Sequence, residues 1–184
     1  MKPTKLLGIL MAFLCSLAFV SCDSDEVYFK SKCTAVLNGQ TYYDQLLLKA
    51  ILNPSTTVTP SVEHLENCTV FHTWLCKEKG GSPVNYPVYY VDIYLFSNSS
   101  EGVYEKEYNF EKADIDYTDG NPSHWEYVKY CKENKISYAD INNEIADKGS
   151  FRFTSYDNEK KEYSGTFTLQ FSEGTMQGEF TIDH

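Results

Sequence analysis

Side chains suited to carbohydrate binding gather in one β-compatible run of the chain. Tyr90, Asp92 and Tyr94 alternate with apolar residues there, so an extended backbone would place all three on one face. Aromatic rings can stack on a sugar while a carboxylate accepts hydrogen bonds from its hydroxyl groups. The two tryptophans, Trp74 and Trp125, are further candidates for the same surface. The alternative is that tyrosine simply suits strands, and fifteen tyrosines in one chain must cluster somewhere.

Two other groupings have the residue types of metal sites. Cys68, His72 and Cys76 would line one face of a helix, but the Thr, Val, Phe and Trp residues among them favour a strand over residues 67–77. A strand spreads the three too far apart for one zinc ion. Residues 114–120 alternate carboxylates as a calcium loop does, yet the fifth position is not acidic and the glycine comes one place late. We therefore predict no metal and no cofactor.

The histidines lie in no recognisable catalytic motif. They are His64, His72, His124 and His184. The sequence contains no Gly-x-Ser-x-Gly nucleophile turn, no His-Glu-x-x-His pair and no phosphate-binding glycine loop. These observations predict a protein that is not an enzyme.

The first residues have the three parts of an export signal. Lys2 and Lys5 precede an apolar run over residues 6–20, and small Ser21 stands before Cys22. The run is shorter than the roughly twenty apolar residues that a membrane-spanning helix needs. We therefore predict a signal peptide over residues 1–21.

Cys22 distinguishes a lipoprotein signal from an ordinary secretory one, because a thiol at the first mature position can accept a diacylglyceryl group. Residues 19–22, Phe-Val-Ser-Cys, resemble a lipobox of the relaxed form found in Bacteroides-type bacteria. The alternative is an ordinary signal peptide cut near Ala18 or Ser21. Residues 22–27 form an acidic tether that resembles the signal for display on the outer surface of those bacteria. We expect a lipid anchor in the outer membrane, with the domain facing either the periplasm or the medium.

Four further cysteines would meet an oxidising compartment after export. They are Cys33, Cys68, Cys76 and Cys131, and their even number predicts two disulfides. Cys68 and Cys76 lie on one predicted strand, roughly 26 Å apart, which excludes that pair. Either Cys33 pairs with Cys68 and Cys76 with Cys131, or Cys33 pairs with Cys76 and Cys68 with Cys131. The alternative is that some are buried free thiols.

The charge balance excludes one class of partner. Removing residues 1–21 leaves 14 basic and 26 acidic side chains, and 14 − 26 gives a net charge of −12. Nucleic acid is therefore not expected as a partner, because phosphate backbones are bound by clustered Lys and Arg.

The chain from residue 28 to 184 is expected to form a single antiparallel β domain. Asn38-Gly39 between two β-compatible runs predicts a hairpin with a type I′ turn. Alternating residues from 151 onward predict a three-stranded meander with one buried face and one solvent-exposed face.

Two short helices are predicted between these strands. Ser123 and Glu126 form a capping box that begins one, and Ile141 and Ile145, followed by Gly149, indicate a second. We count about eight strands. The expected fold class is mainly β, as an up-and-down (lipocalin-like) barrel or a two-layer sandwich with one or two short helices.

The opening and closing hairpins resemble those of small uncharacterised lipoproteins of gut Bacteroides. The resemblance is carried by residues 34–42 (TAVLNGQTY), 163–167 (YSGTF) and 174–180 (GTMQGEF). It implies an envelope location and a β fold, and it implies no activity.

These observations lead to one function hypothesis and two alternatives. The expected function is a non-catalytic cell-envelope lipoprotein that binds a glycan, a small apolar ligand or another envelope protein. The first alternative is a structural or assembly role through a sheet edge. An enzyme of unknown class is the other.

Overall fold

The chain divides into two compact units, Met1–Lys30 and Ser31–His184, and every described residue belongs to the second. The computed structural model describes residues 31–44, 60–65, 67–77, 87–97, 107–115, 120, 122–157 and 159–183. The predicted signal peptide, Cys22 and the tether lie outside these ranges, as do His184 and residues 116–119 of the calcium-like segment.

The described residues form eleven strands and one helix. Their bounds are β1 Lys32–Leu37, β2 Gln40–Asp44, β3 Ser61–Leu65, β4 Cys68–Cys76, β5 Tyr89–Phe96, β6 Glu107–Glu111, α3 His124–Asn134, β7 Tyr138–Ile141, β8 Glu144–Ile145, β9 Lys148–Asp157, β10 Glu162–Phe171 and β11 Gly174–Ile182.

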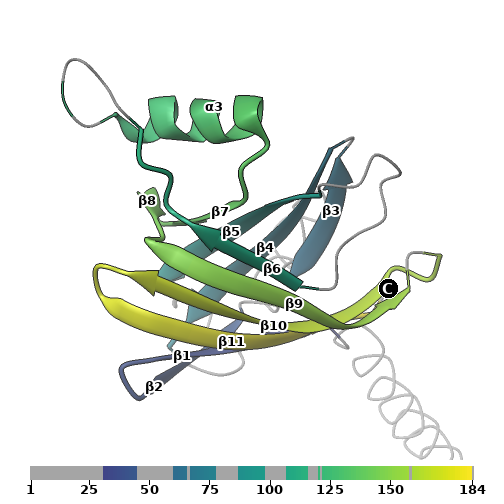
Figure 1. Ribbon diagram of the computed structural model, residues 1–184. Helices are drawn as coiled ribbons and strands as arrows, with labels where there is room; N and C mark the ends of the chain where they lie inside the picture. The colour runs from purple at the N-terminus through teal and green to yellow at the C-terminus, as the bar shows by residue number, and fades with distance from the viewer. Residues whose placement is uncertain are drawn as a thin grey trace, which may run out of the picture. The chain divides into compact units, whose positions relative to one another are not determined.

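All the strands belong to one antiparallel sheet, which curls into a half-barrel (Figure 1). The strand order is β6-β9-β10-β11-β1-β2-β4-β5-β7-β8, and β3 pairs with β4 beside this path. The predicted fold class, a mainly β single antiparallel domain, is confirmed, and its one sheet has a barrel-like form. The count of about eight strands was too low, and the two-layer sandwich is wrong because one sheet curls around its own core.

The predicted Asn38-Gly39 hairpin is confirmed. Leu37 pairs with Gln40 across a two-residue turn, and Asn38 and Gly39 both have positive φ, at 51° and 77°. This is the backbone that a type I′ turn requires. The turn sets the register of β1 against β2.

The second predicted helix is wrong. Ile141 ends β7 and Ile145 ends β8, and the two strands pair across Asn142 and Asn143. Both asparagines have positive φ, at 53° and 69°, which this side chain tolerates better than most. The four-residue spacing of the isoleucines therefore reflects a tight hairpin instead of a helical turn.

The interior of the half-barrel is filled mainly by aromatic rings. Phe71 lies 4.6 Å from Phe180 and 5.5 Å from Phe151 between ring centroids, and all three are at most 3 % exposed. Phe180 pairs across strands with Gly165, and a Cβ at Gly165 would lie only 2.6 Å from the Phe180 ring. The glycine thus makes room for the ring to lie over its backbone.

Helix α3 covers part of the outer face of the sheet. Ser123 caps it, since the Glu126 N–H donates to the Ser123 hydroxyl and the Glu126 carboxylate accepts from the Ser123 N–H, as the capping box predicted. Its buried face packs on the ends of β4, β5 and β7 in a second cluster made by Cys68, Val70, Phe96, Tyr127, Val128, Cys131, Tyr138 and Ile145. Helix α3 does not pack on the opposite ends of β4 and β5, where the candidate site lies.

Candidate functional site

The candidate site lies on the outer face of β4 and β5. Trp74 is paired with Tyr90, and His72 with Asp92, in the register of these two strands. The alternate residues, such as Phe71 and Ile93, are fully buried on the inner face. Because successive side chains of a strand point to opposite faces of the sheet, the Trp74–Tyr90 ring pair and the His72–Asp92 polar pair lie side by side on the outer face.

The aromatic pair presents an accessible ring. Trp74 and Tyr90 meet edge to face with centroids 5.2 Å apart and planes at 68°, and Tyr90 is 45 % exposed. The backbone beside Tyr90 is held by Asn142, whose side chain accepts from the Tyr90 N–H at 2.8 Å and donates to the Val88 carbonyl at 2.9 Å. The β7–β8 turn thereby fixes the strand that carries the ring.

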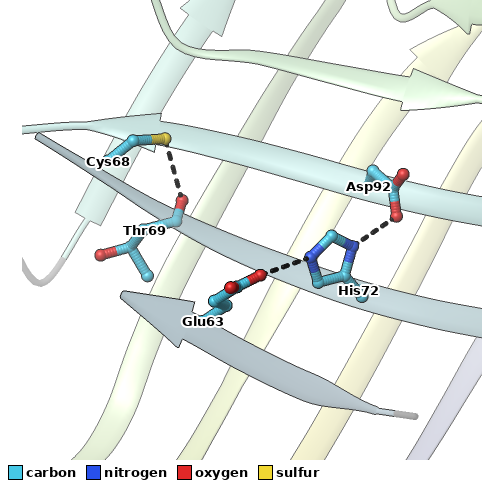
Figure 2. Close-up of polar contacts among 5 residues, drawn as sticks. All are labelled: Glu63, Cys68, Thr69, His72 and Asp92. Atoms are coloured by element: carbon cyan, nitrogen blue, oxygen red, sulfur yellow. Dashed lines mark hydrogen bonds and ion pairs between the residues drawn. The ribbon is translucent and has the colours of Figure 1, made fainter. Parts of the chain in front are cut away.

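The polar pair belongs to a short chain of contacts over three strands (Figure 2). His72 Nδ1 lies 2.7 Å from Asp92 Oδ1, and since a carboxylate only accepts, Nδ1–H is the donor. His72 Nε2 lies 3.8 Å from the Glu63 carboxylate on β3. The His72 ring thus stands between two carboxylates, and Asp92, whose side chain is 37 % exposed, makes no contact through Oδ2 among the described residues.

A second histidine–carboxylate pair continues this row. Asp140 on β7 is directly opposite Asp92, and its Oδ2 lies 2.7 Å from Nε2 of His124 at the start of α3. Two carboxylates directly across a strand pair repel each other, so a histidine partner for each offsets that cost.

The remaining predicted binding residues are separated from the aromatic pair. Tyr94 stacks on Tyr138 at 4.6 Å and 12°, and Lys132 lies over its ring. Burial, with nearby carboxylates, raises the pKa of Tyr94 to about 12. Trp125 is 79 % exposed on α3, where its ring neighbours that of His124. The structure therefore brings together Trp74, Tyr90 and Asp92, and it places Tyr94 on the far side of Asp92 against the cluster under α3 and Trp125 on the exposed surface of α3.

Sequence reasoning missed the partners of the site. From the sequence, His72 is a candidate only for a metal site or a catalytic motif, and nothing there points to Glu63 or Asp140. One signal was present, because His72 lies two residues from Trp74 and so shares its strand face. Its pairing with Asp92 depends on the register between β4 and β5, which the sequence alone does not give.

None of the predicted disulfides forms in the structure: Cys33, Cys68, Cys76 and Cys131 are buried, and no two of them are bonded to each other. Cys33 faces the inner core, while Cys76 alternates with inward-facing Leu75 and so faces outward. Cys68 and Cys131 lie in the cluster under α3. Burial raises the pKa of all four thiols, to about 11 for Cys68.

The arrangement around His72 differs from a hydrolase triad. Ser61 lies opposite His72 on β3, but its Oγ is buried and has no hydrogen-bond partner among the described residues. Within the same ranges, no three His, Cys, Asp or Glu side chains are grouped to hold a metal ion. Cys68, His72 and Cys76 lie along a strand, as predicted. What the site can do is stack a ring and accept hydrogen bonds.

No helix in the described part of the chain has the length and apolar character needed to cross a bilayer.

Comparison with known proteins does not test the resemblance to Bacteroides lipoproteins, which stays a prediction. No protein-family model, curated protein or solved structure matches this chain.

Proposed function

We propose that this chain is a non-catalytic, lipid-anchored protein of the bacterial cell envelope, and that its β domain binds a saccharide on the outer face of β4 and β5. The observation that carries the binding function is the Trp74–Tyr90 ring pair beside the Asp92 carboxylate on the outer strand face, with Tyr90 45 % exposed. An exposed ring stacks on the apolar face of a sugar, and the carboxylate accepts from its hydroxyl groups. These polar neighbours favour a glycan over a small apolar ligand.

The anchor in this proposal is supported by the first residues of the chain. Lys2 and Lys5, the apolar run and Cys22 have the order of a lipoprotein signal. Mass analysis of the native protein should find a diacylglyceryl group on Cys22, and Cys22→Ser should release the protein from membranes. A bare Cys22 thiol would contradict the anchor, and protease treatment of intact cells would distinguish the outer surface from the periplasm.

Saccharide binding is tested by a glycan array followed by calorimetry with the full mature chain. Tyr90→Ala and Trp74→Ala should each weaken binding roughly fivefold or more, because one stacked aromatic side chain contributes about 1–3 kcal/mol. Tyr156→Ala is the matched control, since Tyr156 on β9 is 42 % exposed against 45 % for Tyr90. An empty array, or equal losses in control and site variants, would contradict the proposal.

The geometry gives less support to assembly through a sheet edge. The sheet path ends at β6 on one side, and β6 carries exposed Glu107 and Glu111 at its two ends. Charged residues on an edge strand oppose the addition of another strand.

A further inference from the structure

We infer that the saccharide bound at this site carries a protonated amine. The inference rests on the proposed function and narrows it to cationic amino sugars. It follows from the charges around the ring pair.

An acidic row begins beside the ring pair at Asp92 and continues away from it. Glu63 and Asp92 have side chains that are 62 % and 37 % exposed, and the ion-pair partner of each is His72. Asp140 lies directly across from Asp92, with His124 as its partner. The row has three carboxylates and two histidines, so it keeps a surplus of negative charge whatever the charge of the histidines, and an ammonium group would offset it.

The distances suit one ligand that reaches both parts of the site. Asp92 follows Tyr90 by two residues on the same strand face, which separates them by roughly 7 Å along the strand. A sugar ring lying on Tyr90 can therefore extend a substituent to the carboxylate. The His72 Nδ1–H holds Asp92 Oδ1 in place at 2.7 Å and leaves the second oxygen for the ligand.

A protonated amine should bind more tightly at this site than a neutral or negatively charged sugar substituent. Ammonium forms a charge-assisted hydrogen bond with a carboxylate, and it is attracted to the faces of Trp and Tyr. A uronic acid would meet like charges at Glu63, Asp92 and Asp140. The net charge of −10 also favours the approach of a cation.

The test compares three probes of similar length by calorimetry with the full mature chain: glucosamine oligosaccharides, their N-acetylated forms and galacturonate oligosaccharides. We expect the glucosamine probe to bind roughly tenfold or more tightly than the N-acetylated one, and galacturonate not to bind. Asp92→Asn should remove most of this preference while the N-acetylated probe still depends on Tyr90. Asp157→Asn should leave the preference unchanged, and it is a matched control because both aspartates are 37 % exposed.

The other outcomes would contradict either the cationic ligand or saccharide binding itself. Equal binding of the glucosamine and N-acetylated probes, lost in Tyr90→Ala, would overturn the cationic ligand and leave saccharide binding standing. Tighter binding of galacturonate would overturn it as well. If none of the probes binds and a glycan array is also empty, saccharide binding itself fails. If Asp92→Asn does not fold, Glu63→Gln provides the same comparison at the more exposed carboxylate.

Discussion

Asp44 is an acidic side chain on the inner face of the half-barrel, and its replacement by asparagine should change how stability depends on pH. It pairs with the fully buried Leu75, and its Oδ2 is buried without a hydrogen-bond partner among the described residues. Burial raises the pKa of Asp44 from 3.8 to about 6, although backbone N–H groups of Cys33 and Asp44 itself lower it. The protonated form is thus favoured in the folded protein.

The sign and size of the effect follow from this pKa. Between pH 4 and pH 6 the folded state holds a proton that the unfolded state has lost, so the free energy of unfolding falls as pH rises. The favourable contribution is complete below pH 3.8 and lost above about pH 6. Since each unit of difference between the folded and unfolded pKa corresponds to about 1.4 kcal/mol, the whole change in the free energy of unfolding is on the order of 3 kcal/mol.

Urea unfolding of wild type and Asp44→Asn at pH 4, 5, 6 and 7 measures this change. The wild-type stability minus that of the variant should fall by about 2–3 kcal/mol between pH 4 and pH 7. Taking the difference cancels the other titrating groups. Asp157→Asn is the control with the opposite sign, because hydrogen bonds from Lys160 lower the pKa of Asp157. A difference for Asp44 that stays flat, or rises with pH, would refute the reasoning.

Three further substitutions test how the sheet and helix are held. Gly165→Ala should destabilise the domain by roughly 1–3 kcal/mol in urea unfolding, since the new methyl group would overlap the Arg152 carbonyl and the Phe180 ring; an unchanged midpoint would show that the ring moves freely. Asn142→Ala should cost about 1–2 kcal/mol and weaken binding at Tyr90, while Asn142→Gly, which keeps the backbone conformation, should recover part of the stability. Ser123→Ala should lower stability by about 1 kcal/mol, and Ser123→Asp should restore it if capping is the cause.

Much of the fold could be predicted from local patterns. The strands with one buried face, such as β10 and β11, have strict alternation that only an extended chain can satisfy. The Asn38-Gly39 turn and the Ser123–Glu126 cap have specific local chemistry. The β7–β8 hairpin was missed because its strands have only four and two residues, too few for a period to appear. Strand β3 was missed for a similar reason, since its five residues show no regular burial.

The site was only partly predictable because it depends on pairing between strands. Tyr90 and Asp92 share one strand, so their common face follows from the period of two. His72 comes from another strand and Glu63 from a third, and their positions depend on two registers. Trp125 was grouped with them by residue type alone, which carries no information about distance. A ligand platform made of side chains from several strands is visible only once these registers are known.

The pairing of β1 with β11 has a consequence for how the protein is made. The first described strand has the last one as its neighbour, and Ser31 and Asp183 exchange hydrogen bonds although 152 positions separate them. A nascent chain that still lacks its final strand therefore has a gap in the middle of its sheet. We expect slow folding that begins only after β11 has been synthesised, and urea unfolding of a variant that lacks Met176–Ile182 should show no cooperative transition.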